Sequence, residues 1–120
     1  MELDSILSNL VSKVDGAIGA AIGGMDGLLV EQFAVDTKFD LSSVVAEHSN
    51  LLRGASMAYS SSLDAGEVSE ILIVSQKLLG YTKQITRDFF LTLTLEPNGN
   101  IGKARLMSEL ALKSLREVLG

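Results

Sequence analysis

The chain contains no cysteine and a single histidine, His48, and each scarcity removes a class of function. Without cysteine there can be no disulfide, no thiolate metal site and no cysteine nucleophile. With one histidine, a metal site with two or more histidine ligands and a proton relay between histidines are both excluded. The lack of cysteine also fits a reducing compartment, so we expect a cytoplasmic protein.

Aromatic residues make up only 5% of the 120 residues, tryptophan is absent and Pro97 is the only proline. Hydrophobic residues nevertheless make up 47% and charged residues 21%, a balance typical of a folded domain. The core must therefore consist mainly of leucine, isoleucine, valine, alanine and methionine. The length is that of one ordinary domain, so we expect residues 1–120 to form a single domain.

Charge and hydropathy restrict the possible partners. The net charge is −5 and the ten basic residues are scattered, whereas a nucleic-acid surface needs clustered Lys and Arg, so we expect no nucleic-acid partner. No apolar stretch has membrane-spanning length, and the acidic start from Met1 to Asp4 is unlike a signal peptide, so we expect no membrane insertion. The mean hydropathy of +0.31 is high for such a chain and favours burial of apolar surface by self-association.

The first third of the chain predicts a helix and a β-hairpin. Apolar residues recur at steps of three and four over residues 3–14, which indicates an amphipathic helix. Residues 17–25 alternate instead, and Asp26-Gly27 is a hairpin signal before a returning strand over 28–35. A helix backbone can closely approach one face of the first strand, because that face carries only small residues: Ala17, Gly19, Ala21 and Gly23.

A long second helix is predicted from its cap at Asp40 to about Ser62. Its apolar arc of roughly 140° is wider than the usual stripe of about 100° and therefore offers two contact sides. We expect the first side to face the sheet of the same domain: Leu41, Val45, Leu52 and Tyr59. We expect the second side to face another helix: Val44, Leu51 and Ala58.

The second half predicts three strands and a closing helix. The strands span 68–76, 78–86 and 89–95, and Asn100 caps a helix that runs to about Leu119. In that helix Leu106 and Leu110 point outward, toward the first helix or a partner. The expected buried face is Ile101, Ala104, Met107, Ala111, Leu112, Leu115, Val118 and Leu119.

This order of elements resembles the roadblock family, which includes dynein light chains and MglB-like regulators of Ras-like GTPases. Three segments carry the resemblance: the small-residue strand and turn from Gly16 to Val30, the alternating strand 89–95, and the run from Asn98 to Arg105. The resemblance implies an α+β fold of the roadblock/profilin type with three layers, α/β/α. A five-stranded antiparallel sheet would carry the long helix on one face and the terminal helices on the other.

The resemblance also implies a homodimer, joined edge to edge through the third strand with the two long helices side by side. An edge as apolar as Ile71–Val74 would favour aggregation unless it were paired, which supports this expectation independently. The interface residues expected are Val44, Leu51, Ala55, Ala58, Glu70, Ile71, Leu72, Ile73 and Val74.

We find no pattern typical of an enzyme. The glycines between Gly16 and Gly27 lack the Lys and Ser/Thr of a phosphate loop and lie within a hairpin, so they favour close packing. Ser60, Ser61 and Ser62 with Asp64 form a polar helix end rather than a nucleophile site. Glu67 and Glu70 are expected to be solvated loop and edge charges. We therefore predict no catalytic, cofactor or metal site.

Several side chains have two possible interpretations. Arg53 and Arg87 are ordinary solvated arginines, or one supplies charge to a GTPase transition state. His48 is a hydrogen-bonded core or interface residue, or a pH-sensitive group. Glu47, Arg53, Gly54 and Met57 form the expected partner-binding shoulder, although a single exposed methionine needs no explanation.

The leading hypothesis is a non-catalytic, homodimeric adaptor that binds a small Ras-like GTPase and modulates its nucleotide cycle. The second is a structural scaffold subunit whose binding ignores the nucleotide state. The third is a small-molecule sensor, which would show a closed apolar pocket between sheet and helices.

Overall fold

The computed structural model describes residues 2–120, so Met1, the first residue of the predicted domain, lies outside the described residues. Side-chain oxygens cap both long helices as predicted. Asp40 accepts a hydrogen bond from the backbone N–H of Ser42 at 3.2 Å, and Asn100 accepts one from Lys103 at 3.0 Å. The elements are α1 (Leu3–Lys13), β1 (Ala17–Gly24), β2 (Leu29–Ala34), α2 (Leu41–Ser56), the π-helix η1 (Met57–Ser62), β3 (Glu70–Val74), β4 (Leu79–Gln84), β5 (Phe89–Leu95) and α3 (Ile101–Leu119).

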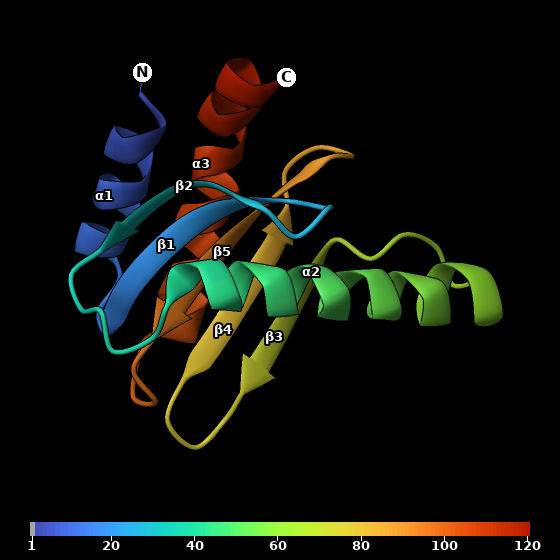
Figure 1. Cartoon of the computed structure of the whole chain (residues 1–120), viewed down its shortest axis with the longest axis horizontal. Helices are drawn as coiled ribbons and strands as arrows, with labels where there is room; N and C mark the ends of the chain where they lie inside the picture. The colour runs from blue at the N-terminus through green and yellow to red at the C-terminus, as the bar shows by residue number, and fades with distance from the viewer. Residues whose placement is uncertain (1) are drawn as a thin grey trace.

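The five strands form one antiparallel sheet in the order β2-β1-β5-β4-β3. Helix α2 crosses one face of this sheet, and α1 and α3 lie side by side on the other, as Figure 1 shows. The expected three-layer α+β fold is therefore confirmed. The order leaves β2 and β3 at the two edges, although they are far apart in the chain.

The small-residue face of β1 lies under α2, as predicted. A Cβ atom added to Gly23 would lie 2.6 Å from Val45 Cγ1 and 2.6 Å from Phe90 Cζ, so the helix and β5 use the space that glycine leaves. Ala17 is an exception to the predicted alternation. It packs with the α1 and α3 side because the pairing of β1 with β5 is irregular between Ala17 and Gly19.

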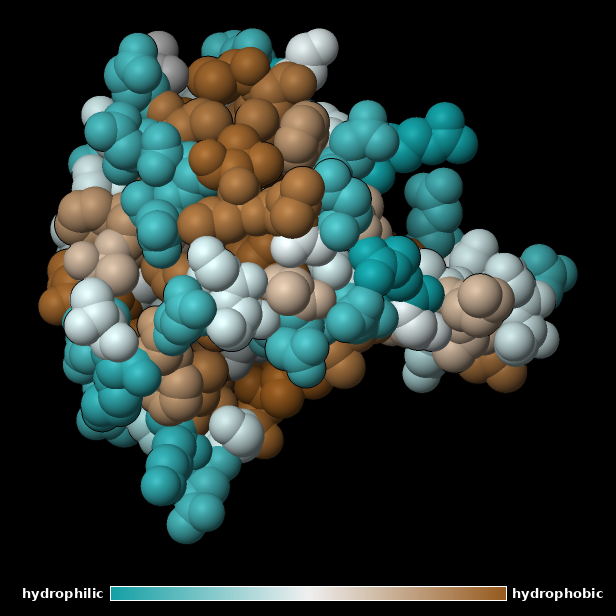
Figure 2. Space-filling view, in the orientation of Figure 1, coloured by the Kyte–Doolittle hydropathy of each residue, from teal (hydrophilic) through white to brown (hydrophobic). Residues whose placement is uncertain are grey.

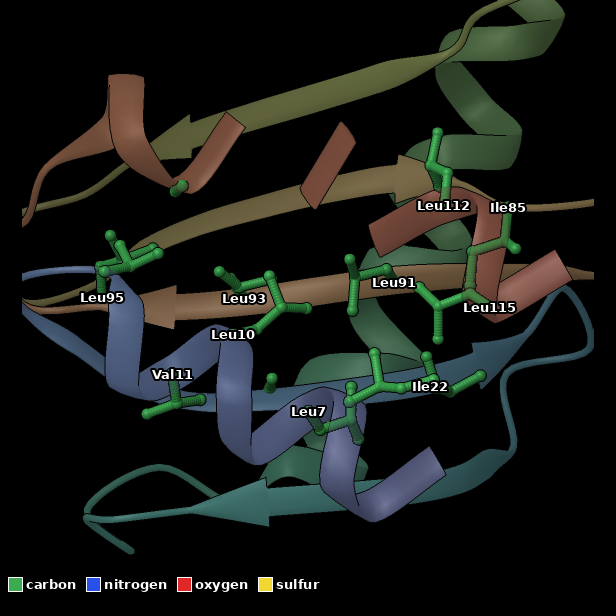
Figure 3. Close-up of a cluster of buried hydrophobic side chains, with 14 of the residues drawn as sticks. Leu7, Leu10, Val11, Ile22, Ile85, Leu91, Leu93, Leu95, Leu112 and Leu115 are labelled. Carbon is green, nitrogen blue, oxygen red and sulfur yellow. The ribbon is translucent and has the colours of Figure 1, made fainter. Parts of the chain in front are cut away.

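The hydrophobic core has two parts, one on each face of the sheet. The larger part lies between the sheet and helices α1 and α3, where Leu7, Leu91 and Leu115 are fully buried (Figure 3). The smaller part lies under α2 and contains Ala21, Leu41, Val45, Leu52 and Phe90. The alternation of β5 is confirmed, because its leucines belong to the first part and Phe90 to the second.

The structure corrects several of the predicted bounds and faces. Strand β3 covers Glu70–Val74 rather than residues 68–76. The long helix continues to Ser62, but its last six residues are a π-helix. Tyr59 is 54% exposed because this end projects past the sheet, and Val118 is 44% exposed rather than buried.

Within residues 2–120, no helix is both long enough and apolar enough to cross a membrane.

Candidate functional site

Strand β3 is a sheet edge with exposed apolar side chains. It pairs with β4 on one side and with no other described strand. Leu72 is 42% exposed, Ile73 39% and Val74 66%, whereas Ile71 is partly buried against the core under α2. An unpaired edge with such side chains is a template for another strand.

The end of α2 projects beyond this edge. Figure 1 shows α2 and η1 extending past β3, and Figure 2 shows the projection standing clear of the rest of the molecule. No residue of η1 is buried, and Met57 is 66% exposed. Because no strand within residues 2–120 lies beneath this end of the helix, its side chains do not contribute to the hydrophobic core.

One residue of the expected helix interface lies beside the β3 edge. Ala55 lines a hollow together with Tyr59 of η1 and with Glu70 and Ile71 at the start of β3. Val44 and Ala55 are half-buried, whereas Leu51 and Ala58 are exposed. The hollow therefore joins Ala55 to the first residues of the expected strand interface.

Glu70 is held by contacts within its own chain and is not the solvated charge that the sequence predicted. Its side chain is only 17% exposed. Tyr81 Oη donates a hydrogen bond to Glu70 Oε2 at 2.8 Å, Arg105 of α3 donates to Oε1, and Lys83 Nζ lies 3.6 Å from Oε2. Lys83 also pairs with Glu109 at 2.9 Å.

These contacts shift two pKa values in opposite directions. The hydrogen bond from Arg105 lowers the pKa of Glu70, and the one from Tyr81 acts in the same direction, whereas burial opposes both. The pKa of Tyr81 is raised, chiefly by burial and then by its hydrogen bond to the Glu70 carboxylate. The network holds Glu70 as a carboxylate and ties β3 to β4 and α3.

The expected partner-binding shoulder is exposed along α2, but Arg53 is occupied. Glu47, Gly54 and Met57 are exposed, and a Cβ added to Gly54 would meet nothing within 4 Å. The guanidinium of Arg53 donates to the carbonyl oxygen of Met25 and to Asn50. It therefore ties α2 to the β1–β2 turn.

A family model of the Roadblock/LC7 domain matches residues 3–95, which is more than half of the chain. The chain belongs to the Roadblock/LC7 family. MglC from Myxococcus xanthus is 31% identical to this roadblock domain, with 99% of this chain and 100% of that chain covered and a TM-score of 0.72. A comparison with curated proteins finds no match.

Other solved structures share the fold at lower identity. A Roadblock/LC7 domain from Streptomyces avermitilis has a TM-score of 0.88 at 20% identity, covering 99% of this chain and 98% of that one. The gliding protein MglB from Thermus thermophilus has a TM-score of 0.83 at 15% identity, covering 95% and 85%. These neighbours show that the roadblock domain shares their fold.

His48 is part of a buried polar chain in this roadblock domain. Its Nδ1 lies 2.7 Å from Thr82 Oγ1, which lies 2.7 Å from Thr92 Oγ1. Burial lowers the pKa of His48, and the nearby Glu47 carboxylate opposes the shift. The interpretation of a hydrogen-bonded core histidine is confirmed, and the neutral form is favoured in the folded protein.

Arg87 borders a surface hollow of the roadblock domain. The hollow has a volume of about 550 Å³ and opens to solvent between the end of α2 and the β4–β5 turn. No hydrogen bond or ion pair joins the Arg87 side chain to any of residues 2–120, so Arg87 remains a candidate contact for a partner. This open hollow, whose lining is largely polar, is not the closed apolar pocket expected of a sensor. The residues that line it are Met25, Ser56, Ser60, Glu67, Val68, Gln84, Thr86 and Arg87.

Proposed function

We propose that this roadblock domain, spanning residues 1–120, is a cytoplasmic homodimeric adaptor. It binds a small Ras-like GTPase and modulates its nucleotide cycle without chemistry of its own. The observation that carries the proposal is the β3 edge, where Leu72, Ile73 and Val74 are exposed beside unpaired backbone groups. Pairing with a second copy satisfies the backbone and covers the apolar side chains at once.

The projecting end of α2 supports the same arrangement. In an edge-to-edge dimer it lies over the junction, next to α2 of the second copy. Val44, Leu51, Ala55 and Ala58 are the residues that this helix pair uses. Alanine at two of these positions lets the helices approach closely, which increases van der Waals contact. The same pairing extends the sheet across both protomers.

The GTPase partner rests on family membership. The paired α2 helices present Glu47, Gly54 and Met57 on an exposed shoulder, while Arg53 shapes it from its hydrogen bonds to Met25 and Asn50. A regulator shifts the nucleotide cycle only by binding one conformation of the GTPase switch regions more tightly than the other. Because Arg53 is already occupied, positioning of residues of the GTPase is the mechanism proposed, rather than donation of this arginine.

The occupied Arg53 also favours a second candidate function, a structural scaffold subunit that ignores the nucleotide state. The two functions differ in nucleotide dependence, so one experiment separates them. The purified protein is immobilised and exposed to host lysate with excess GDP or a non-hydrolysable GTP analogue. Enrichment of a Ras-like GTPase in one state supports the regulator.

The control for that experiment is a variant of the shoulder, Met57→Asp, compared with Leu110→Asp on the opposite layer. Both positions are 66% exposed, so neither substitution removes core packing. The regulator hypothesis expects loss of the GTPase with Met57→Asp only. Equal recovery in both nucleotide states supports the scaffold, and recovery of no GTPase overturns the proposed partner.

A further inference from the structure

The backbone groups of β3 that face the free edge can be assigned from its pairing with β4. The Ser69 carbonyl oxygen accepts a hydrogen bond from Gln84 N at 2.9 Å, and Ser75 N donates to the Leu78 carbonyl oxygen at 3.1 Å. Hydrogen-bonded pairs alternate along an antiparallel ladder, so odd-numbered residues from 69 to 75 direct their N–H and C=O groups toward β4. The outward groups therefore belong to Glu70, Leu72 and Val74.

Symmetry restricts how two such edges can meet. A two-fold axis that makes the β3 strands antiparallel runs perpendicular to the sheet, so both α2 helices stay on the same side. The axis also keeps the side chains of opposite residues on the same face of the sheet. A register that places an odd-numbered residue opposite an even-numbered one is therefore excluded. The axis must pass beside a residue that faces its own copy, and the candidates are Ile71, Leu72 and Ile73.

The length of the edge selects among these three registers. The segment paired with β4 runs from Ser69 to Ser75 and is centred on Leu72. With Leu72 at the axis, all five residues of β3 face β3 of the second copy, and every outward residue has an outward partner. A register centred on Ile71 or Ile73 leaves two residues of each β3 outside the paired region.

The side chains agree with the central register. On the α2 face Ile71 lies opposite Ile73 of the second copy, so the two isoleucines form cross-strand apolar pairs. On the α3 face Leu72 meets its own copy, and Glu70, already held by Arg105, lies opposite Val74. No two like charges face each other in this arrangement.

We propose that two copies of this chain pair antiparallel along β3 with Leu72 at the two-fold axis. This inference rests on the proposed homodimer and specifies its register. Tyr81 and Arg105 hold Glu70 within its own chain, so the pairing of the two β3 strands rests on their outward backbone groups and apolar side chains.

Single-cysteine variants of the full chain test the register, since the natural sequence has no thiol. In the proposed dimer the two Cα atoms at position 72 are about 5.5 Å apart, within the disulfide range of roughly 4.4–6.8 Å. Copies of position 71 or 73 are diagonal neighbours about 7–8 Å apart, beyond that range. Under mild oxidation Leu72→Cys should cross-link at least about tenfold faster than Ile71→Cys or Ile73→Cys.

The outcomes separate the register from the dimer itself, whose presence is measured by light scattering before oxidation. Faster cross-linking of Ile71→Cys or Ile73→Cys overturns the register while the dimer stands. A dimer that cross-links at none of the three positions places the interface elsewhere. A monomer overturns the homodimer of the proposed function.

Discussion

Replacing Leu72 by aspartate should convert the dimer to a monomer at micromolar concentration. Leu72 is 42% exposed, and full burial of a leucine contributes about 1.5–3 kcal/mol, so pairing contributes about 0.6–1.3 kcal/mol per protomer at this position. Symmetry doubles that loss. Two carboxylates on residues whose Cα atoms are about 5.5 Å apart repel by about 3 kcal/mol at an effective dielectric constant of 20. The total of about 4.3–5.5 kcal/mol corresponds to a dimer that is weaker by about one thousandfold to ten thousandfold.

Sedimentation equilibrium over a concentration series measures this dissociation constant directly. Leu72→Asn has nearly the shape of the aspartate without its charge, so it should lose only the apolar contribution and weaken the dimer by about ten- to sixtyfold. Leu110→Asp, on the far layer, should leave the dimer unchanged. If aspartate and asparagine weaken the dimer equally, position 72 does not face its own copy. If neither weakens it, the β3 edge is not the interface.

Three further predictions concern the fold. The free energy of unfolding should fall as the pH drops below about 6.5, because burial lowers the pKa of His48 in the folded protein and the unfolded chain therefore binds the proton more tightly. A single titrating group can change this free energy by at most about 1.4 kcal/mol per pH unit. Thermal denaturation at several pH values should show that His48→Gln lacks this pH dependence. Gly23→Ala should lower the free energy of unfolding by about 1–3 kcal/mol in urea titration, because its Cβ meets Val45 and Phe90 at 2.6 Å. Gly54→Ala should instead raise the free energy of unfolding by about 0.8–1 kcal/mol, because no atom of residues 2–120 lies near the added methyl group and alanine favours a helix more than glycine does. An unchanged or lower free energy of unfolding would contradict this prediction.

Local patterns in the sequence were sufficient for the elements and for several contacts of the core. The alternation over Phe89–Leu95 predicted which side chains face each half of the core, because strand geometry alone sends successive side chains to opposite faces. The small residues of β1 predicted for the same reason that a helix packs closely on that face, and the structure places α2 there. Asn100 was recognised as a cap from its position before a periodic apolar run.

The candidate site was predicted less completely. The apolar run Ile71–Val74 indicated an edge that needs a partner, and the structure leaves that strand unpaired on one side. Nothing local indicated that Glu70 binds Arg105, which lies 35 positions away, or that Arg53 binds Met25 across 28 positions. Such pairs depend on how elements that are distant in the chain pack together, so the periodicity of the sequence does not predict them.

The sequence by itself determined the order of helices and strands, the small-residue face of β1 and the apolar character of β3, since each follows from residue type and spacing within one element. Only the tertiary structure decided what lies beneath each face. Tyr59 shares the helical face of Leu52, yet Leu52 is buried and Tyr59 is 54% exposed, because the sheet ends between them. Periodicity specifies the direction of a side chain, whereas burial depends on whether another element reaches that place.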